Sequence, residues 1–165
     1  MNVALIIAGG SGQRMKQEVP KQFLNVKDKP IVVYTMEAFQ RHEKIDGIIV
    51  VSIEGWEVVI STYARQFGIS KLDGIAKGGA TGQESIYNGL LEAKKKYHND
   101  DIVLIHDAIR PMVSEEIITE CIETAILHGS AITAVPCAEA MLLTESGIHS
   151  TGMIDRKTLK RTQTP

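Results

Sequence analysis

Cysteine, aromatic residues and long apolar runs are all scarce in this chain of 165 residues. Its two cysteines, Cys121 and Cys137, lack the spacing of a metal-binding set or a disulfide framework, and a reducing cytoplasm is the expected compartment. The formal net charge is only -2, which gives no general reason to expect nucleic acid as a partner. No apolar segment approaches the roughly 18 residues that a membrane-spanning helix needs, so no membrane association is expected.

The composition is that of an ordinary globular protein, with 44% hydrophobic and 23% charged residues in a length suited to one domain. Apolar runs predict five buried strands, at 3–8, 48–53, 74–76, 102–105 and 131–135. Helical periodicity fills the intervals between them, at 30–42, 59–68, 86–93 and 114–125. This alternation predicts a single α/β domain over residues 1–165, Rossmann-like, with a mostly parallel sheet and helices on both faces.

The loop after the first predicted strand combines glycines with positive charge. Three glycines and two cations follow that strand closely: Gly9, Gly10, Gly12, Arg14 and Lys21. Glycines let the backbone turn tightly and bring its N–H groups close to a ligand, and the cations suit a polyphosphate. The glycines alone are more typical of a plain turn, because the loop lacks the third glycine of a dinucleotide fingerprint and the Gly-Lys-Ser/Thr of a P-loop.

Two further polar segments follow predicted strands. Gly78-Gly79 comes after the third strand, and His106-Asp107 comes after the fourth. Because ligands of parallel sheets bind beyond the carboxyl ends of the strands, these segments and the glycine loop are expected at one edge. Asp107 there suits Mg²⁺, which binds through one or two carboxylates plus substrate phosphates. The alternative is that Asp107 caps a turn and pairs with Arg110.

Four sequence blocks carry a resemblance to a known family. They read G-G-S-G-Q-R-M followed by P-K-Q, G-G-A-T-G-Q-E-S, H-D-A-I-R-P, and D-R-K-T-L followed by Q-T-P. In this order they resemble the cytidylyltransferases that act on 2-C-methyl-D-erythritol 4-phosphate and their relatives that act on ribitol 5-phosphate. The resemblance implies a CTP-dependent nucleotidyltransferase that joins CMP to a sugar alcohol phosphate and releases pyrophosphate.

The resemblance also implies a role for each matching residue. Arg14 and Lys21 would be catalytic and meet the phosphates, Asp107 would hold Mg²⁺, and Arg156 would bind the phosphate of the sugar alcohol. Nucleotide-binding positions would be Ala8, Gly9, Gly10, Gly12, Gly78, Gly79 and Ser85. Ser85 could instead make only local hydrogen bonds at a helix start, and Arg156 could be a solvated charge.

Two departures from the family pattern leave the substrate open. Gly82 stands where an arginine is usual, and Glu139-Ala140-Met141 stands where relatives tend to carry Asp-Thr. Methylerythritol phosphate is the first expectation and ribitol phosphate the second. A nucleotide-binding module without turnover and a dinucleotide-binding domain are the rival interpretations, the latter disfavoured by the missing third glycine.

The segment from 137 to 160 reads as a hairpin arm outside the sheet. Its apolar side chains would be exposed in a monomer, so a homodimer formed through the arms is expected, with Arg156 carried towards the partner's site. Gln-Thr-Pro is an internal motif in the family, so the C-terminal part of the family fold is expected to be missing here. His42, His98, His128 and His149 show no site spacing and are expected at the surface.

Overall fold

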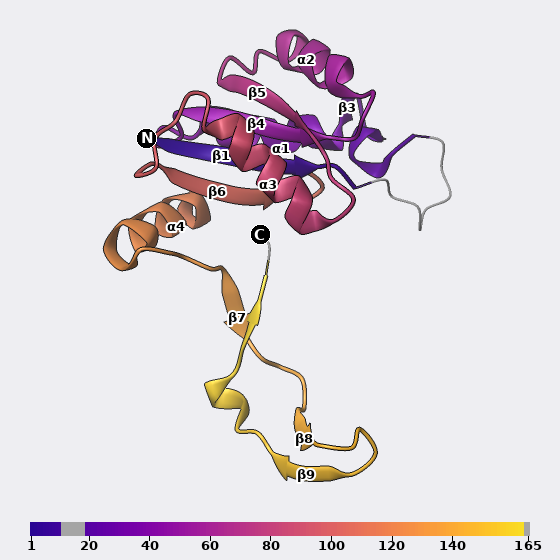
Figure 1. The fold of residues 1–165 in the computed structure, drawn as a ribbon, viewed down its shortest axis with the longest axis vertical. Coiled ribbons are helices and arrows are strands. Elements are labelled where there is room, and N and C mark those ends of the chain that lie inside the picture. Colours follow the sequence, from indigo (N-terminus) through magenta and orange to yellow (C-terminus); the bar gives the residue numbers. More distant parts are fainter. Residues whose placement is uncertain (11–18, 164–165) are drawn as a thin grey trace.

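A computed structural model describes residues 1–10 and 19–163 of the chain (Figure 1). Its centre is a four-stranded sheet in the order β5-β4-β1-β6, with every pairing parallel. The strands are β1 (Asn2–Ala8), β4 (Gly47–Ser52), β5 (Leu72–Lys77) and β6 (Ile102–Asp107). The chain builds outwards from β1 to β5 and then returns to the other side of β1. The strand order therefore reverses between β1 and β6, which is where such sheets bind ligands.

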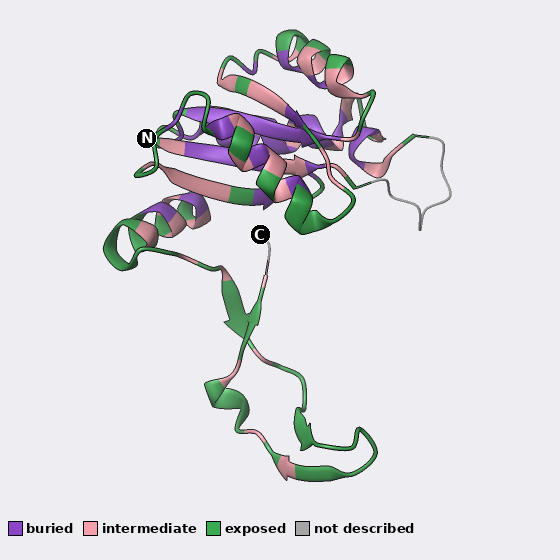
Figure 2. Ribbon diagram, viewed as in Figure 1, coloured by how far each residue is buried: buried purple, intermediate pink, exposed green. Residues whose placement is uncertain are grey.

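Helices cover both faces of the sheet, as the sequence predicted. The apolar side chains of α1 (Ile31–Arg41), α2 (Glu57–Gln66) and α4 (Glu115–His128) form one core with alternate residues of β1 and β4. Helix α3 (Gly82–Ala93) packs on the opposite face, against the other residues of the same strands. All six residues of β4 are buried (Figure 2). A strand covered on both faces must be apolar throughout, which explains the uninterrupted runs in the sequence.

The ends of two helices follow local sequence signals. The Ser114 hydroxyl accepts a hydrogen bond from the Ile117 amide at the start of α4, over 3.4 Å. Gly129 ends the same helix in the left-handed conformation, with φ of 84°. Helix α3 begins four residues before the predicted 86, at Gly82, because Thr81 caps it.

The predicted fifth strand, 131–135, does not join the parallel sheet. Strand β7 (Ala134–Pro136) pairs antiparallel with β10 (Lys160–Thr162), and β6 is an edge of the four-stranded sheet. The Gln163 amide extends this pairing by donating to the Thr133 carbonyl over 2.9 Å. Apolar residues in a short run indicate that a strand forms, but they do not indicate which partner supplies its hydrogen bonds.

The hairpin arm is confirmed and projects away from the sheet (Figure 1). Strands β8 (Leu142–Thr144) and β9 (Ser150–Met153) form a separate antiparallel pair, followed by the short helix η3 (Arg156–Thr158). The apolar side chains of this arm are exposed (Figure 2): Met141, Leu142, Leu143, Ile148 and Met153. No helix in the described ranges has both the length and the apolar character to cross a membrane.

His42 does not lie at the surface, contrary to the sequence prediction. It is buried at the end of α1, where its Nε2 lies 3.0 Å from the Thr119 hydroxyl and 3.2 Å from the Glu115 carbonyl of α4. Its Nδ1 accepts a hydrogen bond from the Lys44 amide. His42 therefore joins two helices, a role that depends on tertiary packing and leaves no mark in sequence spacing.

Candidate functional site

Three loops meet beyond the carboxyl ends of the parallel strands. Within the sheet, Ile7 pairs with Asp107 on β6, and the next residue, Ala8, pairs with Ser52 on β4. Ser52 in turn pairs with Lys77, the last residue of β5. The segments that follow β1, β5 and β6 therefore begin side by side. The sequence predicted this convergence, and it brings together Ala8–Gly10, Gly78-Gly79 and Asp107.

The loops after β1 and β5 touch through glycine backbones. A Cβ atom added to Gly9 would lie 3.3 Å from both the Gly78 Cα and the Ser85 hydroxyl. A Cβ atom on Gly78 would lie 3.2 Å from the Gly9 Cα and 3.2 Å from the Ser52 carbonyl oxygen. The Gly78 amide also donates to that Ser52 carbonyl, over 2.7 Å. Side chains at 9 or 78 would therefore force the two loops apart across the end of β4.

Side chains from the start of α3 hold the turn after β5. The Ser85 hydroxyl accepts from the Gly79 amide (3.0 Å), and a Glu84 carboxylate oxygen accepts from the Ala80 amide (2.8 Å). The Thr81 hydroxyl accepts from the Glu84 amide, which closes a capping arrangement around the helix start. Ser85 is buried, and the local hydrogen bond that we considered as its alternative role is present. Contact of Ser85, Gly78 and Gly79 with a nucleotide stays a prediction.

Lys21 begins a short helix, η2 (Lys21–Phe23), beside the first loop. Its neighbour Gln22 is buried and donates through Nε2 to the carbonyl oxygens of Ala8 (2.5 Å) and Gly10 (3.1 Å). Phe23 stacks on Trp56, with ring centroids 4.2 Å apart. The segment that carries Lys21 is thus fixed to the end of β1. Two predicted site residues, Gly12 and Arg14, lie outside the described residues.

Asp107 sits at the start of a tightly held turn. One of its carboxylate oxygens pairs with the Arg110 Nε over 2.9 Å, and both side chains are partly exposed. The Thr35 hydroxyl of α1 donates to the Ala108 carbonyl over 2.7 Å. The ion pair with Arg110 that we considered as the alternative role of Asp107 is therefore present, and the Asp107 side chain stays 40% exposed. Metal binding by Asp107 stays a prediction.

His106, at the end of β6, contacts both this turn and helix α1. Its Nε2 lies 2.9 Å from the Arg110 carbonyl oxygen, and its ring packs edge-on against Phe39. Burial lowers the pKa of His106 because it disfavours the charged ring, more than the hydrogen bond to Arg110 raises that pKa. The ring is therefore neutral near pH 7. Since a carbonyl oxygen only accepts, the proton resides on Nε2.

Arg156 is not at the loops that carry the other predicted residues. It lies on η3, which follows β9 in the projecting arm, and its Nη1 donates to the Ala138 carbonyl over 3.3 Å. Within one chain, therefore, the structure does not bring Arg156 together with Asp107 or Gly78. Contact of Arg156 with the phosphate of a sugar alcohol, across a dimer interface, stays a prediction.

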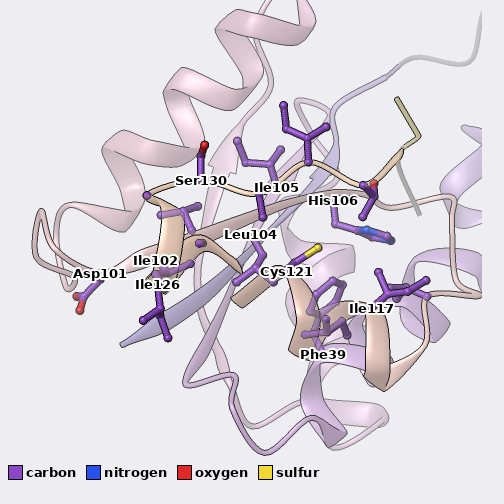
Figure 3. Close-up of a pocket in the computed structure, with 18 of the residues that line it drawn as sticks. Phe39, Asp101, Ile102, Leu104, Ile105, His106, Ile117, Cys121, Ile126 and Ser130 are labelled. Carbon is purple, nitrogen blue, oxygen red and sulfur yellow. The ribbon is translucent and has the colours of Figure 1, made fainter. Parts of the chain in front are cut away.

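A cavity of about 820 Å³ lies elsewhere, along the free edge of β6 (Figure 3). Its walls are largely apolar and come from β6, from α4 and from the segment 129–133. Its acidic lining residues, Asp100 and Asp101, lie near the start of β6, at the opposite end of that strand from Asp107. The described residues that line this cavity include no lysine or arginine, and Asp101 is already paired with the N-terminal amine, so the cavity offers no cation for a phosphate. The loop edge and not this cavity is therefore the candidate site.

Sequence reasoning assigned no role to three residues that shape the site: Gln22, Glu84 and Ser52. A signal for Glu84 was available, since Thr81 followed by an acidic residue three positions later is a capping pattern. Gln22 stands in the P-K-Q block, but its role could not be read from the sequence, because its partners Ala8 and Gly10 are brought to it by the fold. Ser52 contributes through its backbone carbonyl, which a motif does not reveal.

Comparison with known proteins identifies relatives over the whole chain. The family model described as "IspD: 2-C-methyl-D-erythritol 4-phosphate cytidylyltransferase" matches residues 2–165. A ribitol-5-phosphate cytidylyltransferase of Lacticaseibacillus paracasei is 42% identical over 165 residues, which is all of this chain and 70% of that protein. One of Vibrio parahaemolyticus is 44% identical over 147 residues, 88% of this chain and 62% of the relative.

Proteins named for the other substrate also match. A 2-C-methyl-D-erythritol 4-phosphate cytidylyltransferase of Lachnospira eligens is 33% identical over 165 residues, all of this chain and 71% of the relative. The crystal structure of 4-diphosphocytidyl-2C-methyl-D-erythritol synthase from Anaerococcus prevotii superimposes with a TM-score of 0.75 at 25% identity. That match covers 99% of this chain and 68% of the other. The chain thus spans about two thirds of the length of these relatives.

Proposed function

The chain belongs to the IspD family of cytidylyltransferases, and on this premise we propose that it transfers CMP from CTP to a sugar alcohol phosphate. The observation that carries the proposal is the convergence of the Gly9 and Gly78 loops with Asp107 at one sheet edge. A nucleoside triphosphate requires backbone N–H groups that can approach its phosphates and a carboxylate that can hold its metal ion.

We propose ribitol 5-phosphate as the first candidate acceptor and methylerythritol phosphate as the second. Two relatives match all 165 residues of the chain. The one named for ribitol 5-phosphate is 42% identical, whereas the one named for 2-C-methyl-D-erythritol 4-phosphate is 33% identical. This order reverses the one expected from the sequence motifs alone. Both acceptors present a phosphate monoester, so the same chemistry serves either.

The reaction needs no general base. An oxygen of the acceptor phosphate, already an anion, attacks the α-phosphorus of CTP; the bond from that phosphorus to the β-phosphate oxygen breaks, and pyrophosphate leaves with the electron pair. The charge on the transferring group grows in the transition state, so positioned cations lower the barrier. We assign that task to Lys21 and, by the resemblance, to Arg14. The amides and small side chains of the 8–10 and 78–79 segments would receive the nucleotide.

Mg²⁺ is part of the proposal, with Asp107 as its protein ligand. No group of three or more histidine, cysteine or acidic side chains that could hold a metal occurs among the described residues. The single carboxylate of Asp107 fits Mg²⁺, which binds through one or two carboxylates and completes its shell with phosphates and water. It does not fit zinc, which takes three or four protein ligands. When bound, the metal would neutralise charge on the CTP phosphates. Arg110, paired with Asp107, would keep the carboxylate oriented.

We further propose that the active form is a homodimer joined through the hairpin arms, in the cytoplasm where CTP is available. Ile148 and Met153 are 82% and 85% exposed in the single chain, and an isolated two-stranded hairpin is marginal in water. Packing of two arms would cover these side chains. It would also bring Arg156 of one copy towards the phosphate site of the other.

Pyrophosphate release by the full-length protein tests the function. The protein is mixed with CTP and Mg²⁺ and with D-ribitol 5-phosphate or 2-C-methyl-D-erythritol 4-phosphate in turn. We expect release with one acceptor to exceed release with the other by at least about tenfold, which corresponds to about 1.4 kcal/mol in transition-state binding. CTP binding without pyrophosphate release for any polyol phosphate would show a nucleotide-binding module instead.

A further inference from the structure

Gln22 is a buried polar side chain with an unusual pair of partners. It is 1% exposed, and its Nε2 donates to two main-chain carbonyls, those of Ala8 at 2.5 Å and Gly10 at 3.1 Å. Since carbonyl oxygens only accept, the atom between them must be the NH₂ group of the amide and not its oxygen. The chemistry of the two partners therefore fixes the orientation of this side chain.

Both partners belong to the turn that leaves β1. A trans peptide is planar, and its C=O and N–H point in opposite directions. None of the described peptide bonds is cis. With the Ala8 carbonyl directed at the buried Gln22 amide, the Gly9 N–H must point away from it. One side chain thus sets the direction of the backbone at the start of the loop proposed to receive phosphates.

The other end of the Gln22 amide has no partner that the structure describes. Its Oε1 is buried and accepts no hydrogen bond from the described residues. The hydrogen bonds of this side chain are therefore those of its NH₂ group to the loop carbonyls. An apolar side chain of the same size would leave the Ala8 and Gly10 carbonyls without this donor.

Gln22 also ties two parts of the site together. It follows Lys21 directly in η2, and the next residue, Phe23, stacks on Trp56. The Phe23 amide donates to the Pro20 carbonyl over 2.9 Å, which closes the turn. Lys21 is therefore held between a fixed aromatic pair and the carbonyls at the end of β1. Any shift of Gln22 would change the position of Lys21 relative to that loop.

We propose that Gln22 is a positioning residue for nucleotidyl transfer. It holds Lys21 and the Ala8–Gly10 turn in a fixed relative position, so that both contact the same triphosphate. The proposal rests on the proposed function. Gln22 is buried and its donors are used within the chain, so it acts through Lys21 and the loop and not by touching the nucleotide.

The test compares Gln22→Met with a matched control, Gln40→Met, in the full-length protein. Gln40 likewise holds a turn through its side-chain amide, but away from the loops: its Nε2 donates to the Ser70 hydroxyl (3.0 Å) and, unlike in Gln22, its Oε1 also bonds, accepting from the Lys71 amide (2.9 Å). Gln22→Met should lower kcat at least about tenfold and raise the KM for CTP, because misplacement by a fraction of an ångström is costly in a preorganised site. The KM for the polyol phosphate should change less than about threefold, since its phosphate is bound elsewhere.

Calorimetric binding measurements with CTP and with cytidine separate a misplaced phosphate loop from a general loss of structure in the variant. Gln22→Met should weaken CTP binding at least about fivefold more than cytidine binding, because only CTP carries the phosphates. Equal losses for the two ligands, or a kcat within about threefold of that of Gln40→Met, would overturn the proposal. If Gln22→Met fails to fold, Gln22→Asn keeps the amide on a shorter stem and is held to the same criteria.

The same measurements distinguish this proposal from the proposed function. A wild-type protein that binds CTP but releases no pyrophosphate would refute the transfer reaction, and the CTP-to-cytidine ratio would still decide whether Gln22 sets the phosphate loop. A wild-type protein that releases pyrophosphate and a Gln22→Met variant that matches it would refute only the role of Gln22.

Discussion

Replacing Gly78 by alanine should separate the two glycine loops and reduce turnover. The new Cβ would lie 3.2 Å from the Gly9 Cα, whereas carbon atoms prefer about 3.5 to 4.0 Å, so the loops must move apart by about 0.3 to 0.8 Å. The opposing contact, at the Ser52 carbonyl, belongs to the end of a buried strand and cannot relieve the strain. The displacement therefore falls on the loop after β1.

The size of the effect follows from two opposing terms. Overpacking typically costs about 1 to 3 kcal/mol. Alanine also restricts the unfolded chain, which restores about 0.4 to 1 kcal/mol at positions without positive φ, and Gly78 is not among the glycines with positive φ. The net loss is about 1 kcal/mol, or about 2 to 4 °C in Tm for a chain of this size. Turnover should fall about tenfold, since a 1 Å misplacement costs up to about 100-fold.

Thermal unfolding and pyrophosphate release measure the two effects, with Gly82→Ala as the control. A Cβ at Gly82 meets nothing within 4 Å, and Gly82 is the first residue of α3, so alanine there should change stability by less than about 1 kcal/mol and leave turnover in place. If Gly78→Ala matched Gly82→Ala in both Tm and turnover, the close approach of the two loops would have no functional consequence.

Four further predictions concern the proposed machinery, the arm and the buried histidine. Lys21→Ala should lower kcat at least about 100-fold, or about 2.7 kcal/mol, with an unchanged Tm; retention of a third of the turnover would remove Lys21 from the mechanism. Asp107→Asn should raise the Mg²⁺ concentration at half-maximal activity, because the amide lacks the charge that attracts a hard cation, and an unchanged value would place the metal elsewhere. Leu142→Asp combined with Leu143→Asp should give a monomer by light scattering and abolish activity, whereas a fully active monomer would contradict the arm-mediated dimer. The lowered pKa of His106 means that the unfolded state binds more protons, so Tm should fall as pH drops below about 6.5, and His106→Gln should flatten that dependence.

The sequence predicted most of the fold because its strongest patterns are those of strands covered on both faces. The apolar runs of β1 and β4 leave no other arrangement, and the glycines and Asp107 then fall at one edge by topology alone. The partners of the short outer strands could not be predicted, since Ala134–Pro136 carries no information on whether it joins β6 or β10. The roles of Gln22 and His42 could not be predicted for the same reason, because their hydrogen-bond partners come from other elements.

The open edge of β6 has a consequence for handling this polypeptide. Among residues 1–10 and 19–163, no strand pairs with the outer side of β6 in the four-stranded sheet, and Ile105 on this strand is 45% exposed beside an apolar cavity. An unprotected strand edge of this kind is a template for pairing between molecules. The 165-residue polypeptide on its own should therefore aggregate with rising concentration, and a charged residue in place of Ile105 should keep it in solution longer.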